Sequence, residues 1–600
     1  MSLSALASLL PVLIARLRLS MGSRRPERVE GRRAVVLPEQ NLTHSQELEP
    51  VKIPMSRSVP VRRLYAVLLV AGLATWPSSL LHSQSPRGSN AGAQPGSVDD
   101  VTVAELQRRL SDGSLTSRML VEQYQARIQA TDRTGAALRS FIELNPDALV
   151  DADRLDTERK AGRVRGPLHG IPVALKDNIA TGDKMHTTAG SLALAGRPAT
   201  QDAFIVQKLR DAGAVIIGKT NLSEWANFRS THSSSGWSAR GGQTHNPYAL
   251  DRSPSGSSSG SAVAVSANLV TLAIGTETDG SIVSPASVNG IVGIKPTLGL
   301  VSRTGIVPIA HSQDTAGPMA RSVADAAMLL SAIASPDPAD PPTASRTRVQ
   351  TDYTKALDAS GLRGARIGVV RNRLFGSSPA ADALAEAAIA VMKQQGAVIV
   401  DPANIPTLGQ FDDTELDVLL YEFNADIPRF FTWWGAGAPL RSLADLLVFN
   451  NAHPSDELQY FGQELVSQAN AKGPLTDRAY TLALARNHKL AGPEGIDAVM
   501  NRNRLDALVA PTGGPAWLID LVNGDGGTAS APGPSTVAAV AGYPHVTVPM
   551  GFDHGLPVGL SLFGRAWSEA TLIKLAYAYE QATHHRRPPA FAATAALSSP

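Results

Sequence analysis

Cysteine is absent from this chain of 600 residues. Disulfides, thiolate nucleophiles and cysteine metal sites are therefore all excluded. A dominant charge is absent as well, because 55 basic and 53 acidic residues leave a formal net charge of +2. Such a small charge creates no strong field that would favour nucleic acid or an anionic membrane as a partner. With 43% hydrophobic and 18% charged residues, the chain has the composition of an ordinary globular protein.

One apolar run, Leu64 to Trp76, stands out near the N-terminus, and it is too short to span a bilayer comfortably. Arginines precede it and a polar stretch follows, which is the pattern of a secretory signal. We therefore predict a signal peptide over residues 55–85, with the true start at Met55 and an over-called extension over residues 1–54. A Ser-, Gly- and Pro-rich linker over residues 86–98 follows. This interpretation predicts an exported protein, periplasmic or secreted, with no stable membrane span after processing.

Past the linker, short apolar segments alternate with helical patterns, which is typical of an α/β protein. A capping-box pattern from Thr102 to Glu105 marks the first helix. Helical patterns dominate an insertion around residues 410–500, and we expect the late strands to rejoin the first sheet. We thus predict one catalytic domain over residues 99–585 and a tail over 586–600, with the basic run at 584–587 solvated. The expected strands are 171–175, 214–217, 269–274, 366–370, 397–400, 545–549 and 558–563, and the expected helices include 201–212, 379–395 and 568–582.

The stretch Gly213 to Thr220 matches a phosphate-binding loop in letters. Such a loop follows a strand and cradles phosphate with its own backbone N–H groups. Here the first glycine follows a helical pattern, and the Ala, Val, Ile and Ile between the glycines favour a buried strand. Gly213 is better interpreted as the end of a helix, which argues against nucleotide binding.

The stretch Gly256 to Gly260 has the Gly-x-Ser-x-Gly spacing of the nucleophile elbow in α/β-hydrolases. That elbow comes directly after a strand, whereas the preceding residues, Asn246 to Ser255, have the composition of turns. His545 and His554 are candidate partners by position alone. We therefore disfavour the elbow, and a flexible Ser/Gly loop is the simplest alternative.

Three separate segments form a third pattern. Lys176 ends an apolar strand, Ser257 lies in the Ser/Gly loop, and Gly280-Ser281 follows a second apolar strand. Glycine at position 280 lets the backbone turn tightly before Ser281. A lone lysine at a strand end is normally a solvated charge, and a lone Gly-Ser pair is normally a turn. The three segments in this order are much more informative than any one of them.

At these residues the chain resembles the amidase signature family. The resemblance implies an α/β fold in which helices cover both faces of a large mixed β-sheet. It also implies a hydrolase that acts on linear amides, at C–N bonds outside the peptide backbone. The likeness runs from about residue 100 to 585, and its main stretches are Ser255 to Ala262, Asp279 to Ile282, Pro285-Ala286, Gly290 to Thr297 and Ser312 to Pro318.

The resemblance assigns roles to individual residues. Lys176 corresponds to the catalytic lysine, Ser257 to a bridging serine on a cis peptide bond, and Ser281 to the nucleophile. The backbone N–H groups that correspond to the oxyanion hole belong to Thr278, Asp279, Gly280 and Ser281.

Two positions depart from the commonest family pattern. Many members carry two glycines before the nucleophile, whereas this chain has Asp279-Gly280. That pair, together with the stretch Asn227 to Trp237, is similar to the peptide amidase branch of the family. Ser259 stands where glycine is common, and it places a further hydroxyl beside Ser257.

Amide hydrolysis needs a serine that loses a proton as it attacks and a leaving amine that gains one. No histidine lies in these motifs, so another base is needed, and a lysine serves if burial lowers its pKa toward neutrality. The apolar strand before Lys176 makes such burial feasible. We expect a relay in which Lys176 takes a proton from Ser257 while Ser257 takes one from Ser281. Ser257 then returns a proton to the leaving ammonia.

The expected reaction converts a carboxamide into a carboxylate and ammonia through an acyl-enzyme. The branch resemblance points to the C-terminal amide of peptides as the substrate. No cofactor and no metal is expected, since the histidines do not have the HExxH spacing or a comparable one. The candidate pocket walls are Trp237, Tyr421, Phe423 and Trp517, with packing in the core as the alternative for each.

Other functions stay open at this point. The catalytic chain of a glutamyl-tRNA amidotransferase belongs to the same family, but a protein of that kind would need partner chains and tRNA. The signal-like segment and the lack of a basic excess disfavour it, so we expect no nucleic-acid partner. Another family hydrolase acting on small amides is also open. A catalytically inactive binding protein is disfavoured by the intact Lys, Ser and Ser set.

Overall fold

A computed structural model describes residues 98–345, 352–525 and 533–596 of the chain. The expected N-terminal extension and signal peptide, and the linker up to residue 97, lie outside the described residues. They therefore stay predictions. Of the helices that are described, none is both long enough and apolar enough to cross a membrane.

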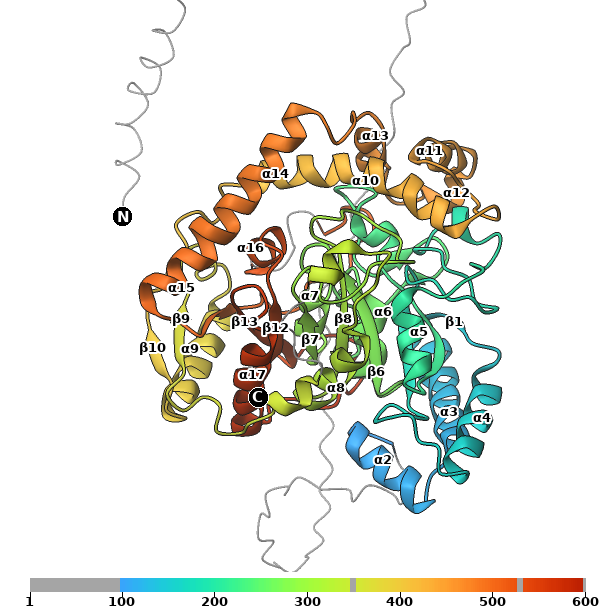
Figure 1. Ribbon diagram of the computed structural model, residues 1–600, viewed down its shortest axis with the longest axis horizontal. Helices are drawn as coiled ribbons and strands as arrows, with labels where there is room; N and C mark the ends of the chain where they lie inside the picture. The colour runs from blue at the N-terminus through green and yellow to red at the C-terminus, as the bar shows by residue number, and fades with distance from the viewer. Residues whose placement is uncertain (1–97, 346–351, 526–532, 597–600) are drawn as a thin grey trace, which may run out of the picture. The chain divides into compact units, whose positions relative to one another are not determined.

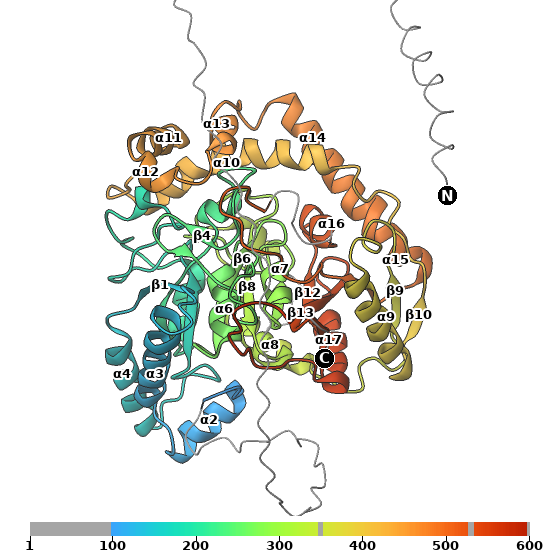
Figure 2. The same cartoon turned by 180° about the vertical axis from the view of Figure 1, so that it is seen from behind.

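An 11-stranded mixed sheet forms the centre of the described chain (Figures 1 and 2). Its strand order is β1-β3-β2-β6-β8-β7-β12-β13-β11-β9-β10. Strands β3, β2 and β6 run parallel to one another, as do β10, β9 and β11, and the other neighbours are antiparallel. The expected mixed α/β sheet is confirmed, and the late strands β12 and β13 join it as predicted.

Each expected strand and helix overlaps an observed element, with ends that differ by a few residues. The strands are β1 (Phe141–Leu144), β2 (Pro172–Lys176), β3 (Val215–Thr220), β6 (Leu272–Glu277), β7 (Val292–Lys295), β8 (Thr315–Ala320), β9 (Arg366–Val369), β10 (Val398–Val400), β11 (Ala507–Pro511), β12 (His545–Asp553) and β13 (Leu556–Phe563), and a separate small pair joins β4 (Trp237–Ser238) to β5 (Gly242–Gln243). The α-helices are α2 (Val103–Asp112), α3 (Ser117–Arg127), α4 (Ala148–Lys160), α5 (Phe204–Asp211), α6 (Ser259–Ser266), α7 (Val283–Val288), α8 (Val323–Ile333), α9 (Pro379–Gln394), α10 (Asp412–Trp434), α11 (Leu443–Ala452), α12 (Pro454–Glu457), α13 (Glu464–Asn470), α14 (Arg478–Ala491), α15 (Asp497–Asn503), α16 (Ser535–Val540) and α17 (Glu569–Thr583). Shorter helical turns are η1 (Ile128–Arg133), η2 (Leu192–Leu194), η3 (Glu224–Asn227), η4 (Pro341–Ser345), η5 (Tyr353–Ala356) and η6 (Gly492–Ile496).

Strand β2 shows why an apolar segment becomes a central strand. All five of its residues are buried, because β3 and β6 flank it and α3 and α6 pack against it. A strand that is covered in this way reads as a continuous apolar run rather than an alternating one. Burial extends to its last residue, Lys176, which is the only charged residue of the strand.

The predicted helical insertion is present as the series α10 to α14. Helices α10 and α14 pack together and lie along one end of the sheet, at the top of Figure 1. Helix α10 buries Phe423, Ile427, Phe430 and Trp434, which recur every three or four residues and so share one face. Hydrogen bonds from the Ser312 N–H to Glu422 and from the Gln313 side chain to Glu415 hold α10 against the loop that precedes β8.

At α2, the first described helix, one of the two hydrogen bonds of the predicted capping box is present. The Thr102 hydroxyl accepts a hydrogen bond from the Glu105 N–H at 3.2 Å, as expected of an N-cap. The Glu105 carboxylate instead pairs with Arg108 and Arg109, so it does not complete the box. Gly113, at φ +78°, then ends the helix.

The stretch that resembles a phosphate-binding loop is a helix end followed by a strand. Gly213 follows α5 with φ +79°, and β3 is buried along its whole length. The Lys219 amine is buried and donates hydrogen bonds to Ile179 O and Thr187 Oγ1. A lysine held in this way is unable to reach a phosphate, so the argument against nucleotide binding holds.

The solvated tail expected after α17 is a wrong prediction at Arg586. The Arg586 guanidinium is largely buried and donates hydrogen bonds to Asp100 and to Ser266 O. Farther on, the backbone of Ala592 accepts a hydrogen bond from Leu250 N–H at 2.8 Å. The basic sequence at this position did not predict the burial of Arg586, because its partner Asp100 lies almost five hundred residues away in sequence.

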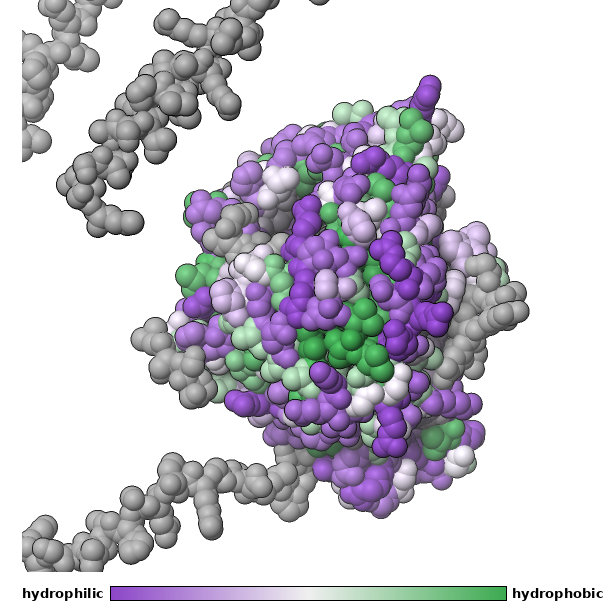
Figure 3. Space-filling model, turned by 90° about the vertical axis from the view of Figure 1, so that its left-hand side faces the viewer, coloured by the Kyte–Doolittle hydropathy of each residue, from purple (hydrophilic) through white to green (hydrophobic). Residues whose placement is uncertain are grey.

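One face of the molecule is shown in Figure 3, where hydrophilic residues predominate around a smaller hydrophobic area. Among the described residues, the exposed large apolar side chains include Val448, Leu482 and Val522. Scattered apolar residues of this kind are normal on a folded protein.

Candidate active site

Lys176 lies at the carboxyl end of β2 and is fully buried. Its Nζ lies 2.7 Å from Ser257 Oγ, 2.9 Å from Thr276 Oγ1 and 3.1 Å from Thr276 O. Burial lowers the pKa of Lys176 to about 7, and the carboxylates of Glu277 and Asp314 limit the fall. The structure thus brings the predicted lysine to the predicted bridging serine, in an environment that favours the neutral amine.

The Ser/Gly loop before α6 is shaped by close contacts that only glycine permits. The Gly256–Ser257 peptide bond is cis, as the resemblance implied. A Cβ atom on Gly256 would lie 2.1 Å from Ser223 Oγ, so no larger residue fits there. The Ser223 N–H also donates to the Ser257 carbonyl at 3.1 Å. These contacts hold the Ser257 backbone in place.

The serines that follow Ser257 are engaged with backbone groups. Ser258 Oγ donates to Thr276 O at 3.0 Å, and Ser259 Oγ donates to Ser255 O at 2.5 Å. The extra hydroxyl of Ser259 is therefore used inside the loop. Ser257 is the hydroxyl of this loop that meets Lys176. The geometry also explains why the elbow spacing is misleading, since turns rather than a strand precede Gly256.

Ser281 lies in the turn between β6 and α7. Glu277, at the end of β6, accepts hydrogen bonds on Oε2 from the N–H groups of Ile282 at 2.7 Å and Val283 at 3.0 Å. Gly280 has φ +76°, a left-handed conformation that favours glycine. The turn therefore depends on one carboxylate and one glycine. It leaves the Ser281 side chain 8% exposed.

Two backbone contacts join the serine segments. The Ser258 N–H donates to the Ser281 carbonyl at 3.1 Å, and the Thr276 N–H donates to Ser258 Oγ at 3.2 Å. Because β2 and β6 are parallel neighbours, their carboxyl ends meet at the same edge of the sheet. The Lys176 amine and the Ser257 hydroxyl meet at this edge, and the Ser281 turn lies against the Ser257 loop through the Ser258 N–H. Within the described residues no hydrogen bond joins the Ser281 hydroxyl to Ser257, so the role of Ser281 stays a prediction.

The turn presents unused hydrogen-bonding groups. Across the described ranges, the backbone N–H groups of residues 278–281 donate no hydrogen bond, and neither does the Ser281 hydroxyl. Backbone N–H groups in folded proteins are nearly always paired. A row of free donors beside a free hydroxyl can accept an anionic oxygen, which is the geometry of an oxyanion hole.

A loop at residues 309–314 braces this turn from one side. Asp314 accepts a hydrogen bond from Thr278 Oγ1 at 2.6 Å and two more from the N–H groups of Ile309 and Ala310. Burial raises the pKa of Asp314 to about 6, although these hydrogen bonds oppose the rise. Gln313 donates to Thr278 O at 3.3 Å and to Glu415 on α10 at 2.9 Å. The helical insertion is thereby linked to the turn that carries Ser281.

A cavity of about 340 Å³ opens beside the turn. Its lining includes Thr276 and Thr278 at one end and Phe430 and Trp433 of α10 at the other. The four aromatic residues expected as pocket walls do not line it. Trp237 packs against Phe461, Tyr421 against Tyr480 and Phe423 against Phe228, while Trp517 Nε1 donates to Asp525. Trp237, Tyr421 and Phe423 are buried, as the core alternative has it, whereas Trp517 is half-buried.

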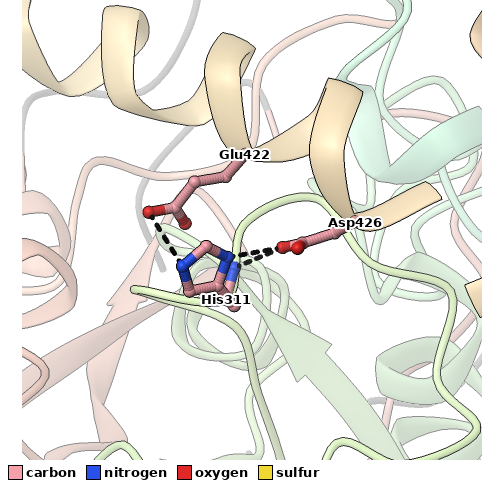
Figure 4. A group of neighbouring side chains, drawn as sticks. All are labelled: His311, Glu422 and Asp426. Carbon is pink, nitrogen blue, oxygen red and sulfur yellow. Dashed lines mark hydrogen bonds and ion pairs between the residues drawn. The ribbon is translucent and has the colours of Figure 1, made fainter. Parts of the chain in front are cut away.

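His311, Glu422 and Asp426 gather above the same loop (Figure 4). Glu422 and Asp426 come from α10, and the His311 ring lies between them. Nδ1 of the ring is 2.7 Å from Asp426 Oδ2, and Nε2 is 3.5 Å from Glu422 Oε1.

This cluster suits a charged histidine better than a metal ion. One possible ligand atom of each residue lies within 4.8 Å of the others, but the two ring nitrogens already face different carboxylates, at 2.7 Å from Asp426 and 3.5 Å from Glu422. Burial lowers the pKa of His311, but the Asp426 hydrogen bond and the Glu422 charge outweigh it and raise the pKa overall. We interpret the cluster as an ion-paired clamp between α10 and the loop.

Comparison with known proteins identifies the architecture that carries this site. A family model described as amidase matches residues 119–573. This chain belongs to the amidase family. The amidase is accordingly a hydrolase that acts on amides, and the resemblance seen in the sequence is confirmed.

Relatives of the amidase share most of its length. A probable amidase of Arabidopsis thaliana is 41% identical over 537 residues, covering 88% of this chain and 98% of the relative. The crystal structure of native peptide amidase from Stenotrophomonas maltophilia is 57% identical with a TM-score of 0.78, covering 82% of this chain and 99% of that one. A glutamyl-tRNA(Gln) amidotransferase subunit of Chloroflexus aurantiacus is 37% identical, covering 81% of this chain and 98% of the relative.

Several residues of the amidase site were not found from the sequence. Glu277 accepts a hydrogen bond from the turn that carries Ser281, and Asp314 accepts one from Thr278. The sequence did not predict either contact. Phe430 and Trp433 belong to the predicted helical insertion, and neither was among the expected pocket residues. The helical periodicity of apolar residues in α10 does not by itself predict that one side of the helix lines a cavity.

Proposed function

We propose that this amidase hydrolyses a carboxamide to a carboxylate and ammonia by a Ser–cisSer–Lys mechanism, with the C-terminal amide of peptides as the substrate. The observation that supports the mechanism best is the set of contacts around the Lys176 amine. Lys176 reaches Ser257 and Thr276 and lies in a site that favours its neutral form.

The groups around Lys176 Nζ match the hydrogen-bonding capacity of a neutral amine. It has two N–H groups and one lone pair. Thr276 O, at 3.1 Å, is able only to accept, and Thr276 Oγ1 lies at 2.9 Å, so the two N–H groups are directed at Thr276. The lone pair is then left for the Ser257 hydroxyl at 2.7 Å. Lys176 in this state is a base for Ser257.

The reaction follows from this arrangement. Ser281 Oγ attacks the carbonyl carbon and passes its proton to Ser257, which passes its own to Lys176. The free N–H groups of residues 278–281 stabilise the negative oxygen. The proton returns through Ser257 to the nitrogen, the C–N bond breaks and ammonia leaves. Water then attacks the Ser281 ester by the same route and releases the carboxylic acid.

The substrate class is supported by similarity. The peptide amidase of Stenotrophomonas maltophilia shares 57% of residues with this chain, against 37% for the amidotransferase subunit. The Asp279-Gly280 pair is also the pair expected of the peptide amidase branch. Export to the periplasm or medium is a further proposal, which rests on the signal-like segment at residues 55–85 alone.

The experiment is ammonia release from peptide amides by the purified protein and its variants. Ser281→Ala and Lys176→Met should each lower kcat by at least about a thousandfold, since the residues of such a set act as a unit. Lys219→Met is the matched control, because Lys219 is equally buried but bonds to neither serine. Normal turnover by Ser281→Ala would refute the mechanism, and turnover of simple amides without any of peptide amides would refute the substrate class.

A further inference from the structure

The cavity beside the Ser281 turn has two chemically different ends. Its inner end is formed by Asn178 and residues 276–278, which include Thr276, the partner of Lys176. Its outer part is formed by the loop 303–309 and by Phe430 and Trp433 of α10. The two rings are stacked, with centroids 5.8 Å apart. A volume of about 340 Å³ is at the lower end of the range for small-ligand pockets.

The charged side chains around the cavity already have partners except Glu277, whose buried Oε1 has none. Arg303 is paired with Asp340, and its guanidinium also donates to the His311 carbonyl. Asp426 is paired with His311 and with Arg429. These groups have no unmet need for a charged ligand, and a charge brought among them would lose its hydration without gaining a partner. The cavity therefore suits an uncharged group.

The apolar surface of the cavity lies in the outer part. Ile306, Val307 and Pro308 follow one another along the loop, opposite the aromatic pair. Gly305 brings the loop so close to α10 that a Cβ atom there would lie 2.8 Å from the Trp433 ring. Trp433 is thus fixed as a wall rather than free to fill the space. Aromatic rings bind apolar groups with large area and a preferred geometry.

The inner end of the cavity is polar. Within the described residues, Asn178 Oδ1 and Glu277 Oε1 have no hydrogen-bond partner, but both atoms are buried, with almost no accessible surface. Asn178 also donates to Thr276 Oγ1, which directs its amide to the Lys176 site. The apolar residues of the lining, rather than these two oxygens, are therefore what a ligand in the cavity contacts.

We propose that this cavity binds the apolar side chain of the residue that bears the scissile carboxamide, with aromatic side chains fitting best. This inference rests on the proposed function, because it places the substrate carbonyl at the N–H groups of residues 278–281. From there the cavity begins at Thr278, the first of these residues. An apolar side chain then reaches the Phe430 and Trp433 rings through the cavity.

The test is a comparison of kcat/KM for the N-acetyl amides of Phe, Leu, Ala, Glu and Lys. The wild-type enzyme should prefer Phe and Leu over Ala by at least about tenfold, and Glu and Lys should fall below Ala. Trp433→Ala should lower the Phe to Ala ratio at least about tenfold. Trp567→Ala is the matched control, because Trp567 is an exposed tryptophan outside the cavity, and it should keep the ratio.

A second variant keeps the inference testable if Trp433→Ala fails to fold. Ala339 is exposed at the cavity rim, so Ala339→Trp should narrow the entrance without disturbing the core and should also lower the ratio. Equal kcat/KM for all five amides, or a ratio untouched by both variants, would overturn the inference while leaving the amidase function standing. Failure to release ammonia from any of the amides would instead count against the proposed function.

Discussion

The pH dependence of turnover tests the neutral lysine directly. Burial lowers the pKa of Lys176 to about 7, with Glu277 and Asp314 opposing the fall. The amine accepts a proton only when it is uncharged, so its active form is roughly a tenth of the enzyme at pH 6, about half at pH 7 and roughly nine tenths at pH 8. We expect kcat/KM for a neutral peptide amide to rise roughly tenfold from pH 6 to pH 8 and then to level off.

The Glu277→Gln variant sharpens this test. Glutamine keeps an oxygen that accepts the N–H groups of Ile282 and Val283, but it removes the largest of the charges that favour the lysine ammonium. The pKa of Lys176 should therefore fall further, and the midpoint of the profile should move to lower pH. N-acetyl amides do not titrate in this range, so the midpoint belongs to the enzyme. A wild-type midpoint near 10, or a midpoint that moves to higher pH in Glu277→Gln, would refute a buried neutral lysine as the base.

Two further predictions concern the turn and the clamp. Gly280→Ala forces a side chain into φ +76° and places its Cβ 3.2 Å from Ser535 Oγ, so kcat should fall about a hundredfold while stability falls by about 1–3 kcal/mol; an active variant with an unchanged melting temperature would contradict the role of the turn. His311 has a raised pKa in the folded protein, so its contribution to stability is complete below the unfolded pKa of about 6.5 and is lost as the pH rises through the folded pKa. His311→Gln should accordingly lower the melting temperature more at pH 5.5 than at about pH 9, and an equal loss at both would exclude the ion-paired clamp.

Much of the fold of this protein could be predicted from patterns in its sequence. Apolar runs such as the one that ends at Lys176 became buried strands, because a run without polar residues is stable only where it is covered on both sides. The order of Lys176, Ser257 and Ser281 identified the family. Gly280 marked the turn, since a left-handed backbone favours glycine whatever the surroundings. The strand and the turn were predicted correctly because each depends on neighbouring residues alone.

Tertiary structure decided what depends on contacts between distant parts of the chain. The pKa of Lys176 is set by burial and by Glu277 and Asp314, which lie about a hundred residues away or more. The bracing of Thr278 by Asp314 and the cavity wall made by Trp433 likewise join segments that no local pattern connects. Burial, pKa and pocket shape are properties of packed neighbours. The sequence by itself therefore determined the fold class and predicted the candidate catalytic residues, and only the folded chain decided their electrostatics and the space beside them.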